Sequence, residues 1–385
     1  MSEDLFQRRT RALQDALNAA GISLALITDE DSIYFFSGYH GYLYMEFGRP
    51  TVLAVPQAGP CAIVTPAMEL EMAQRMSWVE RILPWQDGVG REWREPLDEL
   101  LGEVGEGPLG IEAAALPPVV RTHLGERDLR DISADVAALR RIKGPADIAL
   151  ARHAGQVAEA MMAAARATIG EGVPEYEVAL ATTAAGTRKA AELFEAHYDA
   201  SMMSPNAHFL QTMASGSDTT MPHHRATTKR LKRGDPVFMC FCGMTNFRRF
   251  KLGFDRMFWV GELGDPLQAE VYEVALASQR AALAKVRPGV TAETVHLAYA
   301  EVIQGAGYDF PFRCGRATGF SFLESPQITQ GDKTVLEPGM VLAVDGSVNC
   351  PGVFRAQVGD SLVVTNDGYE LLTNYPKALD EMIVG

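Results

Sequence analysis

The sequence predicts an α/β protein of two domains, the second of which contains a duplicated unit. With 385 residues, the chain is longer than one hydrophobic core usually serves. Within residues 1–140, short apolar segments alternate with helical segments, as they do in α/β domains. Beyond residue 140, a long helix followed by a glycine turn and a second helix occurs twice. We therefore expect domains at residues 1–140 and 141–385.

Composition limits the kinds of partner that the protein is expected to have. The chain is 47% hydrophobic and 22% charged, which is typical of a globular protein with a large core. Its formal net charge of -14 argues against binding to nucleic acid or to anionic membranes. The N-terminal segment is a charged amphipathic helix rather than a signal peptide, and the 5 cysteines are scattered. We expect a reduced, cytoplasmic protein that acts on a small molecule.

The first domain is expected to begin with a helix at residues 4–20 and a strand at 23–27. Residues 29–32 are expected to turn the chain. The aromatic-rich segment from Ile33 to Pro56 favours half-buried strands, although it could also line a ligand site. The other predicted elements are strands at 51–55, 61–64 and 82–84 and helices at about 66–76, at about 92–103 and from residue 117.

In the second domain, the repeated unit comprises a helix at residues 145–168 leading into 169–186, and another at 269–286 leading into 287–307. Each copy has a glycine turn and a short acidic cap before its second helix. Such a repeat indicates pseudo-twofold symmetry, and ligand sites often form between the two halves of a duplicated domain.

Chemistry-bearing residues follow the predicted strands of this second domain. The apolar segments 237–241 and 254–260 are expected to pair, with the turn Pro222-His223 before them and Asp255 on the second strand. An imidazole near a buried carboxylate suffices for proton transfer, but a structural histidine and an Asp255–Arg256 pair would also fit. A strand is predicted at 341–344, and the segment 354–360 leads into a last strand at 361–365. The predicted sheet ends collect His223, Asp255, Arg316, Asp345 and Arg355.

The order of these motifs resembles the pita-bread family of aminopeptidase P, prolidase and creatinase, over essentially the whole chain. The resemblance rests on Pro222-His223, on Gly234-Asp235, on the two strands that follow and on the Leu-Glu-Pro-Gly-Met-Val segment at 336–341. It implies a C-terminal pita-bread domain preceded by a smaller domain of the creatinase and prolidase type.

The resemblance also implies that the metal ligands of the family's peptidases are replaced. Those enzymes hold two metal ions with two Asp, one His and two Glu. The matching positions here are Cys240, Gly253, Arg316 and Asp345, with Gln357 or Gly359 at the last. A thiol, one carboxylate and an amide do not form an oxygen cage for paired divalent metals, so we expect neither a metal nor another cofactor.

Creatinase, the metal-free enzyme of the family, matches more closely. The resemblance implies that His223 is the catalytic histidine, with Asp255 and Asp345 in place of two substrate-binding glutamates. It also implies a homodimer whose active site is shared between subunits. The expected substrate contacts are Tyr44, Phe47, Arg49 and Arg316.

The expected activity is therefore metal-independent hydrolysis of a C–N bond in a small zwitterionic amidino or guanidino compound. Two carboxylates would hold the cation, two arginines the anion, and His223 would carry the proton. Three alternatives remain open from the sequence. They are a metallopeptidase acting on Xaa-Pro peptides, an ectoine-type osmolyte hydrolase or lyase, and a non-catalytic binding protein.

Overall fold

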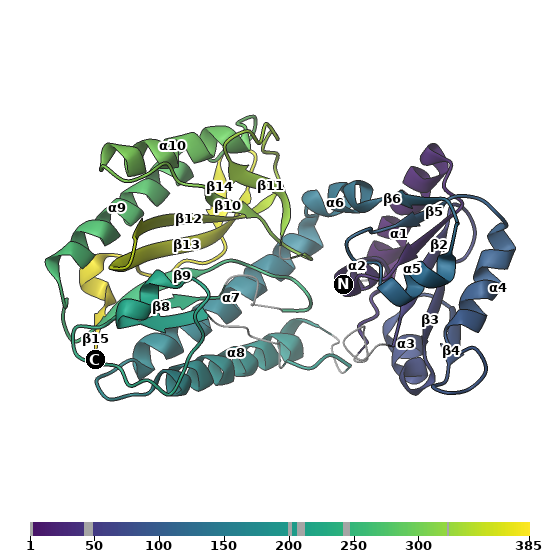
Figure 1. Ribbon diagram of the computed structural model, residues 1–385, viewed down its shortest axis with the longest axis horizontal. Helices are drawn as coiled ribbons and strands as arrows, with labels where there is room; N and C mark the ends of the chain where they lie inside the picture. The colour runs from purple at the N-terminus through teal and green to yellow at the C-terminus, as the bar shows by residue number, and fades with distance from the viewer. Residues whose placement is uncertain (1–2, 42–48, 199–201, 206–211, 242–246, 322) are drawn as a thin grey trace. The chain divides into compact units, whose positions relative to one another are not determined.

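The structure is a computed structural model that describes residues 3–41, 49–198, 202–205, 212–241, 247–321 and 323–385. The chain forms two compact units, Met1–Arg140 and Arg141–Gly385. Each unit combines helices with a β-sheet (Figure 1), so the predicted mixed α/β class is confirmed. Within the described ranges, no helix is both long and apolar enough to cross a membrane.

The first unit contains a mixed six-stranded sheet in the order β4-β3-β2-β1-β5-β6. β1 pairs antiparallel with β2 and parallel with β5, and its four residues are all buried. The strands are β1 (Leu24–Ile27), β2 (Val52–Pro56), β3 (Ala62–Pro66), β4 (Arg81–Trp85), β5 (Leu109–Ile111) and β6 (Leu129–Asp131). The last two are only three residues long and were not predicted.

Helices flank this sheet in the first unit. They are α1 (Glu3–Ala20), α2 (Glu30–Ser37), α3 (Leu70–Met76), α4 (Arg94–Val104), α5 (Pro118–Leu124) and, at the boundary, α6 (Ser133–Arg141), with a short 3-10 helix at Ala67–Glu69. Leu97 and Leu100 of α4 and Val120 and Leu124 of α5 are buried in one cluster with side chains of the sheet. This cluster is the hydrophobic core of the unit.

The prediction of a turn at 29–32 followed by strands was wrong, because residues 30–37 form helix α2. Asp29 caps the helix by accepting a hydrogen bond from the Ser32 backbone N–H at 2.8 Å. Gly38 ends it in the left-handed conformation, with φ at 80°. Residues 32–37 are all buried, so they show no polar face, and periodicity cannot distinguish such a short apolar segment from a strand.

The second unit contains a strongly curved sheet in the order β11-β10-β12-β13-β9-β8-β7, with two short strands added at its side. Its strands are β7 (Thr212–Ser215), β8 (Pro236–Cys240), β9 (Asp255–Val260), β10 (Arg313–Ala317), β11 (Glu324–Thr329), β12 (Val341–Cys350), β13 (Phe354–Val364), β14 (Tyr369–Leu371) and β15 (Ile383–Val384). β8 and β9 pair antiparallel, as predicted.

Two helix pairs recur in this unit, as the repeat predicted. α7 (Pro145–Thr168) packs along α8 (Glu175–His197), and α9 (Pro266–Leu283) packs along α10 (Ala292–Gly305). Figure 1 shows the two pairs on opposite sides of the sheet. α9 contacts both β12 and β13, the two longest strands. Short 3-10 helices lie at Gly216–Thr220 and Leu379–Met382.

Two predicted strand boundaries were wrong, and both errors concern the site. Asp345 lies in the middle of β12 rather than at its end, and β13 begins at Phe354 rather than at Ser361. Gly, Ser, Asn and Asp are poor strand formers, so local propensity stops the strands too early. Ten continuous cross-strand pairs between β12 and β13 override that propensity.

A fully buried ion pair joins β9 to β13. Arg256 donates to the Asp360 carboxylate at 2.7 Å and to the backbone oxygens of Asp255, Gly359, Tyr375 and Pro376. Asp360 also accepts from Lys377 and Gln279. Although burial acts to raise the pKa of Asp360, Arg256 and Lys377 outweigh it and hold that pKa below its usual value. The carboxylate that pairs with Arg256 is therefore that of Asp360. It is not that of the sequence neighbour Asp255, as the structural alternative considered above would have it.

We predict that Asp360→Ala lowers the free energy of unfolding by about 3–5 kcal/mol, because it leaves the guanidinium buried without its counter-charge. Urea denaturation followed by circular dichroism measures this loss. Glu370→Ala is the matched control, since it removes the exposed carboxylate that pairs with Arg152 and should cost less than about 1 kcal/mol. Equal losses in the two variants would contradict the prediction.

Candidate active site

Four residues form one row across four neighbouring strands of the second unit. Cys240 of β8 lies opposite Asp255 of β9, Asp255 lies opposite Gly359 of β13, and Gly359 lies opposite Asp345 of β12. Directly opposed residues project to the same face of a sheet. A methyl group placed on Gly359 would clash with a carboxylate oxygen of each aspartate. The two carboxylates therefore converge above the glycine.

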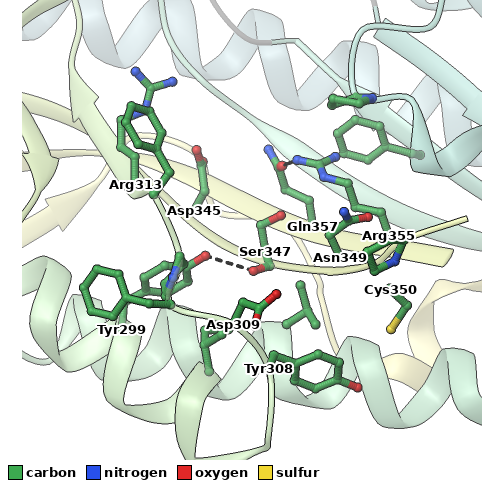
Figure 2. Close-up of a pocket in the computed structure, with 18 of the residues that line it drawn as sticks. Tyr299, Tyr308, Asp309, Arg313, Asp345, Ser347, Asn349, Cys350, Arg355 and Gln357 are labelled. Carbon is green, nitrogen blue, oxygen red and sulfur yellow. Dashed lines mark hydrogen bonds between the residues drawn. The ribbon is translucent and has the colours of Figure 1, made fainter.

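A cavity of about 1,010 Å³ opens beside this row. Its floor includes Asp345 and the cross-strand pairs Ser347–Gln357 and Asn349–Arg355, which follow at two-residue spacing along β12 and β13, whereas Asp255 and Gly359 do not line it. Figure 2 shows the polar side chains of these pairs projecting into the same space. The sequence-predicted residues His223, Asp345 and Arg316 all line it.

Gln357 connects Asp255 to Arg355. Its side-chain oxygen accepts a hydrogen bond from the Arg355 guanidinium, and its amide nitrogen donates to Asp255 Oδ2 at 2.5 Å. Because a guanidinium can only donate, the orientation of this amide is determined by its neighbours. Asp255 is fully buried and accepts this hydrogen bond.

Asp345 has a different environment from Asp255. Its Oδ1 atom is buried and has no hydrogen-bond partner among the residues that the structure describes. Burial and the neighbouring Asp255 raise the pKa of Asp345 to about 7, although Arg316 and two further arginines act to lower it. Near neutral pH, Asp345 can therefore carry a proton, and carboxyl groups with a pKa raised in this way serve as acids in enzymes.

The two adjacent histidines are placed differently. His223 lies in the turn after the 3-10 helix Gly216–Thr220, is exposed and lines the cavity. The Nδ1 atom of His224 lies 2.9 Å from the Met213 backbone oxygen, so this ring is engaged with the main chain. Only His223 is in a position to meet a ligand in the cavity.

The predicted arginines fall in different units. Arg316 lies on β10, opposite Ala343 of β12, and is 3% exposed at the cavity wall. Arg49 lies in the first unit, where its Nε donates to Asp87 at 2.8 Å. Tyr44 and Phe47 lie outside the described residues. The sharing of the site between subunits stays a prediction.

The donor set at this site does not fit a pair of divalent metal ions. The four-strand row offers a thiol, two carboxylates and a glycine, and an amide N–H points at one carboxylate. Within the described part of the chain, no three His, Cys, Asp or Glu side chains are grouped as metal ligands would be. Divalent metals of this kind need several oxygen or imidazole donors, so no step of the chemistry is assigned to a metal here.

The sequence analysis missed the role of the Gln357 amide and treated Gln357 only as a replaced metal ligand. It placed Arg355 at the predicted sheet ends but gave it no role. The signal was present in the spacing of residues 355, 357 and 359. Alternate residues of a strand share a face, so a strand that begins at Phe354 places all three on the face that carries Asp345.

The raised pKa of Asp345 predicts a specific pH dependence of stability. The folded state holds the proton of Asp345 up to about pH 7, whereas the unfolded chain releases it near the ordinary aspartate pKa of 3.8. Stability contributed by this proton is therefore present at low pH and is lost as pH rises from about 4 to about 7.

We expect the free energy of unfolding of the unsubstituted protein, measured relative to that of Asp345→Asn, to decrease as pH rises from about 5 to about 8. The variant has no proton to lose at position 345. Urea denaturation at the two pH values measures the difference. Asp309→Asn, which removes an exposed carboxylate from the same cavity, is the control. A difference between the protein and Asp345→Asn that does not change with pH would contradict the assignment.

Comparison with known proteins places the whole chain in one family. Residues 149–366 match the model of metallopeptidase family M24, and residues 9–142 match the creatinase/prolidase N-terminal domain. The agropine synthesis cyclase of Rhizobium rhizogenes is 31% identical over 97% of both chains, and the creatinase of a Bacillus species is 27% identical over 99% of this chain and 93% of its own. The crystal structure of dipeptidase PepE from Mycobacterium ulcerans, 25% identical, superposes with a TM-score of 0.81 over 100% of this chain and 99% of its own. The chain therefore belongs to metallopeptidase family M24 and carries the creatinase/prolidase N-terminal domain.

Proposed function

We propose that the protein is a metal-independent hydrolase that cleaves a C–N bond in a small amidino or guanidino compound, with His223 as the general acid and base. The observation that carries this proposal is the meeting of His223, Asp345 and Arg316 in one cavity whose floor lacks the donors for a metal pair. Family membership and the match to a creatinase support the reaction class.

In this proposal, Asp345 binds the planar cation in the cavity, and Asp255 lies buried next to Asp345. Asp255 is held in place there by the hydrogen bond that it accepts from the Gln357 amide. Asp345 gives up its proton when the cation arrives, because a nearby positive charge lowers the pKa of a carboxyl group. Arg316 then pairs with the anionic end of the substrate through its forked N–H donors.

His223 carries the proton through the reaction. It removes a proton from water as the water oxygen bonds to the central carbon of the substrate, and it returns that proton to the leaving nitrogen as the C–N bond breaks. An imidazole titrates near neutral pH and can serve in both directions. Its exposed position in the turn gives it access to the cavity.

A second candidate reaction is ring closure on the same site. The relative that is 31% identical over 97% of both chains is named an agropine synthesis cyclase. In ring closure, a nucleophile within the substrate would replace the attacking water while His223 still transferred the proton. Mass spectrometry separates the two reactions, because hydrolysis adds a water molecule to the substrate and ring closure with condensation releases one.

A peptidase activity is the third candidate, since relatives such as the dipeptidase PepE share the fold. We predict instead that the purified protein carries no stoichiometric manganese, zinc or iron and that EDTA leaves its activity unchanged. The reason is the donor set of the four-strand row. Elemental analysis and a chelation series measure both outcomes, and activity that disappears with EDTA and returns with metal would overturn the prediction.

We predict that His223→Ala lowers kcat by about 10²–10⁴-fold with substrate binding largely kept, because positioned proton transfer usually contributes that much. His224→Ala is the matched control and should lose far less, since its ring contacts the Met213 backbone instead of the cavity. Steady-state kinetics on amidino and guanidino compounds measure the two values. Small and equal losses would remove His223 from the mechanism.

A further inference from the structure

Arg355 occupies the outer part of the cavity floor, away from the two carboxylates. It lies on the same strand face as Gln357 and Gly359, and it is directly opposite Asn349 of β12. Two residues of strand separate successive pairs, so each step along the floor is roughly 6.6 Å. Figure 2 shows Arg355 beside Gln357 and Asn349, with Asp345 farther along β12.

The guanidinium of Arg355 directly contacts neutral side chains, although its charge also acts to lower the pKa of Asp345. No carboxylate of the described residues lies within 4.0 Å of it, and its hydrogen bond goes to the neutral side chain of Gln357. It also lies over the ring of Phe238, 5.3 Å from the ring centroid. Other arginines of this unit, such as Arg256 and Arg152, pair with carboxylates. A guanidinium has five N–H donors, so most of its donors can meet a ligand.

The charge and size of the cavity suggest what that ligand is. Three arginines and two aspartates line the cavity, although the whole protein has a formal net charge of -14. A partly buried positive site in an acidic protein attracts anions to that place. The volume of about 1,010 Å³ is at the upper end of small-molecule sites, so a ligand longer than a minimal zwitterion has space.

We propose that Arg355 binds a second carboxylate of the substrate, at the end away from the bond that reacts. The stacked and hydrogen-bonded guanidinium presents its remaining N–H groups as a fork, the geometry that carboxylates accept in pairs. The substrate class is then an elongated compound with acidic groups near both Arg316 and Arg355. This inference rests on the proposed function only in treating the cavity as the substrate site.

The test uses simple dicarboxylates as probes of the full-length protein. Isothermal titration calorimetry with succinate, glutarate and adipate should show binding, and Arg355→Gln should weaken the best probe by about tenfold or more. Arg313→Gln is the matched control, because Arg313 lines the same cavity but bonds to Gln327. Arg355→Lys should keep part of the affinity, since it keeps the charge without the fork.

Gln357→Leu distinguishes ligand binding from positioning. If Arg355 acted only by orienting Gln357, this variant would weaken binding as much as Arg355→Gln, and the proposal would be overturned. Equal effects of the Arg355 and Arg313 variants, or no binding of any probe, would also overturn it. Repeating the titrations in His223→Ala, which cannot transfer the proton, separates this inference from the catalytic proposal. If Arg355→Gln weakens dicarboxylate binding to the same extent in the His223→Ala background, the inference stands even if His223 proves to have no catalytic role.

Discussion

The buried Arg256–Asp360 ion pair is the interaction on which the candidate site depends. Each partner directly follows, in sequence, a residue of the four-strand row: Arg256 follows Asp255, and Asp360 follows Gly359. Successive strand residues point to opposite faces, so the ion pair links β9 to β13 on one face while Asp255 and Gly359 lie on the other. The guanidinium also binds the backbone oxygens of Asp255 and Gly359 themselves. The ion pair between β9 and β13 thus supports the row in which Asp345 lines the cavity and Asp255 lies buried.

The two faces of the sheet use buried charge in opposite ways. Behind the sheet, Asp360 is surrounded by donors, and its pKa is held low. In front, Asp345 has an oxygen without a hydrogen-bond partner in the described part of the chain, and its pKa is raised to about 7. A buried carboxylate whose oxygens all have hydrogen-bond partners contributes rigidity, whereas one with a free oxygen is available for a ligand. The adjacent sites divide structural and chemical roles between carboxylates of the same type.

Long, uniform elements could be predicted from the sequence, and pairings between distant strands could not. The predicted helix 145–168 coincides with α7, because Pro145 at its start and its small apolar residues give local signals. The residues expected at the site were named, and His223, Arg316 and Asp345 do line one cavity. The role of Gln357 depends on the contacts of its amide with Asp255 and Arg355, which no local pattern records. The buried helix α2 was missed because it lacks a polar face.

The glycine beneath the two carboxylates has a consequence for how this protein can change. A glutamate at position 359 would restore the residue type of a metal ligand, but its first side-chain carbon has no space between Asp255 and Asp345. Gln357, which reaches over to Asp255, would have to move as well. A single substitution of Gly359 by a metal-ligating residue therefore disrupts the site. Interconversion of the two chemistries on this scaffold requires several coordinated replacements, and laboratory evolution toward it would need libraries that vary these positions together.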